Sequence, residues 1–205
     1  MKPQDIETMS FQIIESEAGN HGFSDEHWPI VRRMVHTSAD FEYIKSIRFH
    51  PDAVAAGVAA IRAGKNIITD TTMALSGIRK ASINGFGGQV FCHVADPEIS
   101  RKAKEQGVTR SRLAVDEATS DMDGGIYAIG NAPTALLRLM ELIREKKATP
   151  ALVLGFPVGF VNAAESKAEL LDMDIPYITN VGRKGGSNIA AAVVNALIIM
   201  AESAH

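Results

Sequence analysis

The segment around His36 combines residue types that are suited to proton transfer. An imidazole titrates near neutrality, so His36 can give or take a proton at physiological pH. Asp40 follows four residues later, and in a continuous helix the two side chains would share a face, where the carboxylate could orient the ring. Arg32, four residues before His36, would oppose protonation of the ring. The spacing indicates either an acid–base histidine or a half-buried histidine held by a local ion pair.

A second segment suited to chemistry is the glycine-rich stretch 180–188, which reads NVGRKGGSN. It places Arg183 and Lys184 between glycines, just before the last predicted helix. Free backbone N–H groups at a helix start, with two cations beside them, are suited to binding an anion. The alternative is a solvated turn with an ordinary serine cap. The stretch lacks the residue order of a phosphate-binding P-loop.

Further cations stand just past glycines elsewhere in the chain, namely Arg79, Lys80 and Arg110. Each alone would be a solvated surface charge, but as a set in a chain with a formal net charge of -3 they favour a polyanionic ligand. Other kinds of site are not supported. The histidines form no HxxxH or HExxH pair for zinc, and no serine stands in a GxSxG elbow, so we predict no metal site and no hydrolase.

Composition predicts one globular domain over residues 1–205. Hydrophobic residues make up 46% and charged residues 22% of the 205, as in ordinary globular proteins. The single cysteine, Cys92, excludes an intrachain disulfide and fits a reducing compartment. The apolar stretch 189–201 is broken by Asn195 and is too short to span a bilayer. The negative net charge argues against nucleic acid. We therefore expect a cytoplasmic protein that binds neither membrane nor nucleic acid.

Hydrophobic periodicity predicts three helices first and then an alternation of strands and helices. The first helix is expected over 3–18, the second carries His36 and starts from a cap at Ser24, and the third lies between Pro51 and Gly64. Five short apolar strands are expected at 66–69, 89–94, 126–129, 151–154 and 176–179. Further helices are expected at 73–78, 97–107, 109–120, 133–146, 163–173 and 187–202.

Apolar strands that alternate with helices imply a parallel sheet covered on both faces. The pattern fits an α/β fold of three layers, flavodoxin-like and doubly wound, with a mainly parallel five-stranded sheet. Ligands of such folds bind beyond the carboxyl ends of the strands, and these ends are rich in small and polar residues in this chain. Asn162 and Glu165 have the spacing of a capping box, so Glu165 is predicted to be structural.

Seven segments can be read together, in order and without a large gap between about residues 10 and 200. They are SFQII at 10–14, VHTSADF at 35–41, TDTTMALSGI at 69–78, TRS at 109–111, GNAPTAL at 130–136, PVGFVNAAESK at 157–167 and GRKGGSN at 182–188. In this combination the chain closely resembles the precorrin-8X methylmutase family of cobalamin biosynthesis. The motifs resemble most the anaerobic branch, whose substrate already carries cobalt. Asn162 stands where glycine is common in the family, and Arg79-Lys80 replaces a more variable polar-basic pair.

The resemblance implies a homodimer with active sites near the subunit interface, and an isomerase that needs no separate cofactor. The family moves a methyl group from ring carbon 11 to ring carbon 12 of precorrin-8X or cobalt-precorrin-8, giving hydrogenobyrinate or cobyrinate. His36 aligns with the catalytic histidine, whose proposed role is general acid toward a nitrogen of ring C. Such a rearrangement needs a proton donor, a rigid cavity and charge that holds carboxylates.

Charge and position then select candidate substrate-binding residues. Five cations are candidate clamps for ring carboxylates, and three polar residues are weaker candidates for the ring edge. They are Arg79, Lys80, Arg110, Arg183 and Lys184, and Ser10, Thr72 and Asn131. One alternative is a tetrapyrrole carrier that uses the same pocket, with His36 as a ligand, and hands the macrocycle to the next pathway enzyme. A more distant alternative is a phosphate- or nucleotide-binding regulator that uses the loop 182–188.

Overall fold

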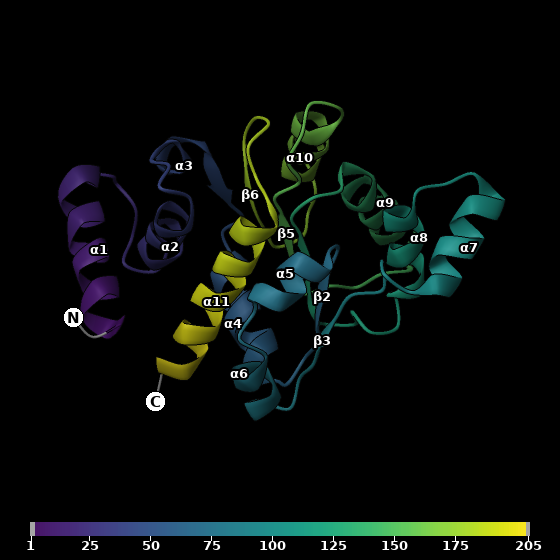
Figure 1. Ribbon diagram of the computed structural model, residues 1–205, viewed down its shortest axis with the longest axis horizontal. Coiled ribbons are helices and arrows are strands. Elements are labelled where there is room, and N and C mark those ends of the chain that lie inside the picture. Colours follow the sequence, from purple (N-terminus) through teal and green to yellow (C-terminus); the bar gives the residue numbers. More distant parts are fainter. Residues whose placement is uncertain (1–2, 204–205) are drawn as a thin grey trace.

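A computed structural model describes residues 3–203, which form a mixed α/β fold around a six-stranded sheet (Figure 1). The strands lie in the order β1-β6-β5-β4-β2-β3 across the sheet. All neighbours are parallel except β1 and β6, which are antiparallel. The strands are β1 (Ile47–Phe49), β2 (Ile67–Thr69), β3 (Val90–Phe91), β4 (Ile126–Ile129), β5 (Leu152–Gly155) and β6 (Tyr177–Asn180).

The helices agree with the predicted segments to within a few residues at most ends. They are α1 (Pro3–Ala18), α2 (Trp28–Ser38), α3 (Glu42–Ser46), α4 (Ala53–Arg62), α5 (Thr72–Gly77), α6 (Lys80–Gly85), α7 (Pro97–Gln106), α8 (Arg110–Glu117), α9 (Pro133–Arg144), α10 (Ala163–Leu171) and α11 (Ser187–Ser203). The helix that carries His36 begins at Trp28, because Ser24 bonds the N–H of His27 within a preceding turn and does not cap the helix. The short helices α3 and α6 were not predicted.

The prediction of five strands is wrong, because β1 adds a sixth. This strand has three residues with Arg48 at its centre, so it lacks the continuous apolar run from which the other strands were predicted. Tertiary pairing holds it: Ile47 lies opposite Asn180, and the N–H of Val181 donates to the carbonyl of Ser46 at 2.8 Å. The five predicted strands are all present, and all five run parallel.

Side-chain alternation along the strands gives the sheet two apolar faces. One face packs against α2, α4 and α11, and the other against α8, α9 and α10. Within β4, for example, Ile126 and Ala128 point to the first face, while Tyr127 and Ile129 point to the second. Two helical layers therefore enclose the sheet, and α1 lies outside α2 (Figure 1).

The last helix, α11, forms the centre of the first layer (Figure 1). It packs on α2, α4 and α5, and most of its residues are buried. Gly57 of α4 allows a close approach, because a Cβ there would meet the side chain of Leu152 at 2.7 Å. Although α11 is apolar, no helix in the described part of the chain has the length and apolar character needed to cross a bilayer.

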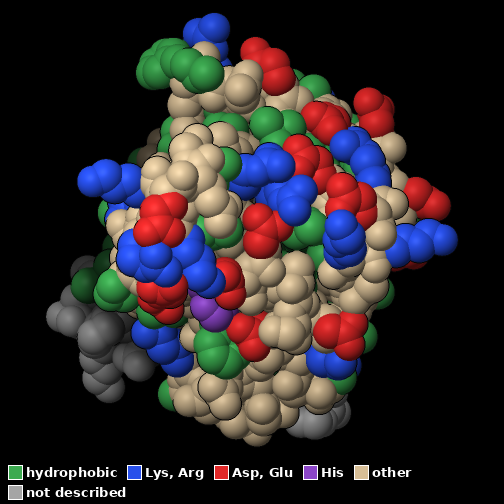
Figure 2. Space-filling view, turned by 90° about the vertical axis from the view of Figure 1, so that its right-hand side faces the viewer, with side chains coloured by type: hydrophobic (Ala, Val, Ile, Leu, Met, Phe, Trp, Pro, Cys, Tyr) green, Lys and Arg blue, Asp and Glu red, His purple; other side chains and the backbone are tan. Residues whose placement is uncertain are grey.

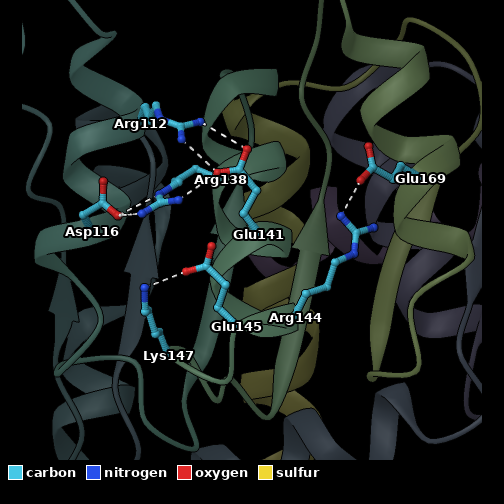
Figure 3. A network of polar contacts seen from close by, with 8 residues as sticks. All are labelled: Arg112, Asp116, Arg138, Glu141, Arg144, Glu145, Lys147 and Glu169. Atoms are coloured by element: carbon cyan, nitrogen blue, oxygen red, sulfur yellow. Dashed lines mark hydrogen bonds and ion pairs between the residues drawn. The ribbon is translucent and has the colours of Figure 1, made fainter. Parts of the chain in front are cut away.

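Ion pairs cover the outer surface of the second layer (Figure 3). Arg138 lies between Asp116 of α8 and Glu141 of its own helix, at 2.7 and 2.8 Å. Arg144 of α9 pairs with Glu169 of α10 at 2.7 Å. At the end of the molecule formed by α7 and α8, cations and carboxylates are interspersed and hydrophobic side chains are scattered (Figure 2). These ion pairs join α8 to α9 and α9 to α10 at the surface.

Candidate active site

One buried carboxylate joins the carboxyl ends of β2 and β4. Asp70 follows β2 and is only 2% exposed. Its oxygens accept hydrogen bonds from the backbone N–H groups of Gly130, Asn131 and Ala132, each at 2.8 Å. Burial raises the pKa of Asp70, and the three N–H donors oppose this by favouring the charged form. The turn 130–132, which holds the predicted contact residue Asn131, is therefore fixed to the end of β2.

A hydroxyl pair ties the same region to the start of α11. Thr71 caps α5 by accepting the N–H of Ala74, and its Oγ1 lies 2.7 Å from Oγ of Ser187. Gly130 packs on the same residue, since a Cβ on Gly130 would come within 2.5 Å of Cα of Ser187. Three loops, after β2, β4 and β6, thus lie side by side at the carboxyl edge of the sheet.

The β6–α11 loop, residues 181–186, has the features expected for anion binding. Gly186 donates its N–H to the carbonyl of Phe156, and a Cβ on Gly185 would lie 2.2 Å from the same oxygen. Among residues 3–203, the N–H groups of 182–185 have no acceptor. The Arg183 guanidinium lies 5.5 Å from the ring centre of Phe160, and both side chains are exposed. Anion binding at this loop stays a prediction.

Lys184 links this loop to the end of the His36 helix. Its Nζ pairs with the carboxylates of Asp40 and Glu42. The hydrogen bond from Lys184 holds the pKa of Asp40 below its usual value. The spacing predicted that Asp40 shares a helical face with His36, and this prediction is wrong. The helix ends at Ser38, and the left-handed Ala39 (φ 52°) turns the chain toward Lys184.

His36 lies on the exposed last turn of α2. Its ring makes an edge contact with Phe11 of α1, with ring centres 5.1 Å apart. Within the described residues the imidazole has no hydrogen-bond partner. Arg32, which the spacing placed near the imidazole, pairs with Glu15, and its guanidinium lies over the ring of Phe11. The imidazole nitrogens are therefore available to a ligand.

His36 borders two hollows. The first, the α11 hollow, measures about 220 Å³ and lies between α2, α5 and α11. It is lined by His36 with Arg33, Thr37, Gly77, Asn188, Ala191, Ala192 and Asn195. The second, the α1 hollow, measures about 410 Å³ and lies between α1 and the end of α2. It is lined by His36 with Ser10, Ile13, Ile14, Glu17, Val35, Ala39 and Phe41.

The three predicted polar contacts and Arg110 lie at the α1 hollow or near the carboxyl edge of the sheet. Ser10 lines the α1 hollow, and its hydroxyl donates to the carbonyl of Ile6. Thr72 is the exposed first residue of α5, and Asn131 is exposed on the turn that Asp70 fixes. Arg110 is the exposed first residue of α8, beside the start of α9, because the Thr109 hydroxyl donates to that of Thr134.

Arg79 and Lys80 lie elsewhere. The Arg79 guanidinium pairs with Glu202 at 3.1 Å, near the far end of α11. Lys80 begins α6, which lies on the opposite side of Figure 1 from the β6–α11 loop. The structure therefore does not bring these two cations together with Arg183 and Lys184 in one chain.

Two polar residues on the inner faces of helices were not predicted as site residues. Asn195 lines the α11 hollow, accepts the N–H of Arg79 and donates to the carbonyl of Gly77. Lys167 is buried on α10. The signal in both cases is a polar residue within the apolar stripe of a helix; Lys167 shares its stripe with Ala163 and Leu170.

The predicted capping box at Asn162 is absent. Asn162 has a left-handed backbone (φ 60°) and its side chain caps nothing, because side-chain caps normally require an extended backbone. A left-handed conformation is one that glycine adopts without strain. Asn162 therefore has the backbone conformation expected at a position where the resemblance implies a glycine.

The sequence profile described as Precorrin-8X methylmutase matches residues 5–200. The chain belongs to this family. A cobalt-precorrin-8 methylmutase from Priestia megaterium is 49% identical over 203 residues, which cover 99% of this chain and 90% of that protein. A precorrin-8X methylmutase from Pseudomonas aeruginosa is 40% identical, covering 95% and 94%. The crystal structure of a Thermus thermophilus precorrin-8X methylmutase matches with a TM-score of 0.90 at 47% identity, covering 97% and 96%. The resemblance drawn from the motifs is thus confirmed.

Proposed function

We propose that this chain is an isomerase of corrin-ring biosynthesis, which moves a methyl group from ring carbon 11 to ring carbon 12 of its substrate. Relatives that match nearly the whole chain are named as methylmutases. The observation that carries the proposal at the site is the exposed imidazole of His36, which lies between two hollows and has no hydrogen-bond partner among residues 3–203. The methyl group moves within one molecule, so the reaction requires no leaving group and no added nucleophile.

The proposed role of His36 is general acid. It donates a proton or hydrogen bond to a nitrogen of ring C and so assists the electron shift that accompanies methyl migration. Phe11 limits the motion of the ring from one side, and the α11 hollow provides a surface of small residues, including Ala191 and Ala192, on the other. A positioned donor on a rigid helix suits a reaction whose barrier is lowered by orientation.

The substrate carboxylates are proposed to bind cations around the carboxyl edge. Arg183 and Arg110 are exposed and free of carboxylate partners among residues 3–203. Lys184 would exchange Asp40 or Glu42 for a ligand carboxylate. The proposed substrate is cobalt-precorrin-8 rather than precorrin-8X, because relatives that are 41% to 49% identical are named as cobalt-precorrin-8 methylmutases. No separate cofactor is proposed, and cobalt would enter as part of the substrate.

We also propose a homodimer. Large apolar side chains are exposed on α1 and in the β5–α10 loop, and burial against a second copy would remove them from water. They are Ile6, Met9 and Ile13, and Val158, Phe160 and Val161. A cytoplasmic location and handover to the next pathway enzyme are part of the same proposal.

The fold is proposed to be a single flavodoxin-like domain over residues 1–205. Counted along the chain, the five parallel strands have the order 2-1-3-4-5, which is the order of flavodoxin-like doubly wound sheets.

The test is single-turnover conversion of cobalt-precorrin-8 by the wild type and by His36→Ala, with binding followed by absorbance. We expect the variant to bind the substrate and to lose at least about 100-fold in the rate of methyl transfer. His50→Gln is the matched control, because His50 lies at the opposite edge of the sheet, where its N–H bonds the carbonyl of Tyr177.

Other outcomes would contradict the proposal in distinct ways. Equal conversion by both proteins would assign the proton to another donor. Binding without conversion by the wild type would favour the tetrapyrrole carrier. Thermal stabilisation by nucleotides, and not by a corrinoid, would favour the regulator.

A further inference from the structure

Lys167 is a buried cation without a counter-charge. The residue is 1% exposed and lies on the inner face of α10. Its ammonium donates to the backbone carbonyl of Lys184 and lies 3.4 Å from Oδ1 of Asn180. No carboxylate pairs with it in the described part of the chain. A buried charge held only by neutral acceptors reduces stability, so its presence calls for a function.

The ammonium lies directly beneath the β6–α11 loop. The carbonyl of Lys184 accepts from Lys167 and also from Nδ2 of Asn180, at 2.9 Å. The same Asn180 amide contacts the carbonyl of Val181. The inner side of the loop is therefore held by Lys167 and Asn180, while Arg183 is exposed on the loop and the N–H groups of 182–185 have no acceptor within residues 3–203.

The charged groups around this loop leave Lys167 unneutralised. Lys184 occupies Asp40 and Glu42. The hydroxyl of Tyr43 reaches the carbonyl of Gly185, and burial raises the pKa of Tyr43 to about 12, so this group stays neutral.

On α10 itself, Glu165 is exposed and Glu169 pairs with Arg144. Burial lowers the pKa of Lys167 to about 8, with no opposing charge to raise it. The side chain therefore titrates far below an ordinary lysine.

We propose that Lys167 is a positioning residue of the β6–α11 loop, and that a substrate carboxylate bound on the outer side of that loop supplies the counter-charge for its buried ammonium group. The proposal rests on the proposed function, because it names the substrate carboxylate as the anion. Binding then favours the ammonium form of Lys167, so the protein takes up a proton when it binds ligand above pH 8.

Two pH dependences of opposite sign follow. Affinity for a polycarboxylate falls as the pH rises through about 8, because the neutral amine no longer attracts the anion. The free energy of unfolding rises between about pH 8 and the ordinary lysine pKa of 10.5, because the unfolded chain binds more protons in that window. A lysine that served stability alone would not weaken binding when it loses its charge.

The experiment measures the Kd of cobyrinate by absorbance between pH 7 and 9.5. We expect the wild type to bind about tenfold more weakly at pH 9.5 than at pH 7, the factor that corresponds to one pKa unit. Lys167→Met is expected to bind about tenfold more weakly at pH 7 and to show a flat profile. Lys104→Met, on the exposed surface of α7, is the matched control and should follow the wild type.

A second measurement needs no variant. Calorimetry of cobyrinate binding at pH 8.5, in buffers of different ionisation enthalpy, should show net proton uptake by the wild type. If Lys167→Met fails to fold, this measurement alone decides. Binding with a flat pH profile and no proton uptake would overturn the role of Lys167 and leave the proposed function standing. If the wild type binds no cobyrinate at pH 7, the proposed function fails as well.

Discussion

Two regions of the molecule use the same types of cationic side chain in different ways. On the outer surface of α8 to α10, Arg112, Arg138 and Arg144 each pair with a carboxylate of a neighbouring helix (Figure 3). At the carboxyl edge of the sheet, Arg183 contacts an aromatic ring and Lys167 contacts neutral oxygens. Exposed ion pairs add little stability individually. Cations without carboxylate partners, in contrast, are available to an anionic ligand.

The difference also separates two kinds of carboxylate. Asp116 and Glu141 are partly exposed and bind cations. Asp70 is buried and, within residues 3–203, accepts from the backbone N–H groups of the turn 130–132 and pairs with no cation, so it shapes a loop. The paired surface can therefore tolerate substitutions that the carboxyl edge cannot.

The largest effect is expected for Asp70→Asn. An amide cannot accept from all three N–H groups as a carboxylate does, so buried donors lose their partner and the free energy of unfolding falls by about 3 kcal/mol. Urea denaturation followed by circular dichroism measures the loss. Asp116→Asn is the matched control and should reduce stability by about 1 kcal/mol or less. Equal losses in the two variants would remove the distinction between the regions.

An intermediate effect is expected for Arg183→Ala. Removal of an unpaired cation at the loop should weaken cobyrinate binding about fivefold, equivalent to about 1 kcal/mol. The dependence of the Kd on salt should become shallower, because one screened attraction is lost. Arg144→Ala removes the same charge from the paired surface and should leave the Kd unchanged. A similar loss of affinity in both variants would show that only net charge matters.

The smallest effect is expected for the coupling between Arg144 and Glu169. Both side chains are well exposed, at 49% and 39%, so a double-mutant cycle to alanine should give a coupling energy of about 0.5 kcal/mol or less. The cycle is measured as unfolding free energies at low and high salt, and the coupling should shrink at high salt. A coupling above about 2 kcal/mol would mean that this surface is more than a solvated cover.

Elements with a local signal were predicted well from the sequence. The apolar run 126–129 became β4, and the small-residue and apolar pattern after Ser187 became α11. β1 was missed because its stability comes from pairing with β6, more than a hundred residues away in the chain. Local periodicity cannot report a partner at that distance.

The geometry around the candidate site was predicted only in part, for the same reason. His36 was proposed from its residue type, and its catalytic role stays a prediction; the structure places it on the exposed last turn of α2. The predicted pairing of His36 with Asp40 is wrong, because the helix ends before Asp40. The left-handed residue at this helix end is Ala39, and the sequence lacks the glycine that usually signals such an end. The roles of Asp70 and Lys167 depend on loops that meet only in the folded chain.

The position of α11 has a consequence for synthesis of the chain. Residues 187–203 are the last described segment made by the ribosome, yet they form the centre of the layer that holds α2, α4 and α5. The earlier helices emerge without the surface on which they pack, so their apolar faces stay uncovered until residues 187–203 have been made. His36 and the loop with Lys184 therefore come together only after α11 has been made and has packed against α2.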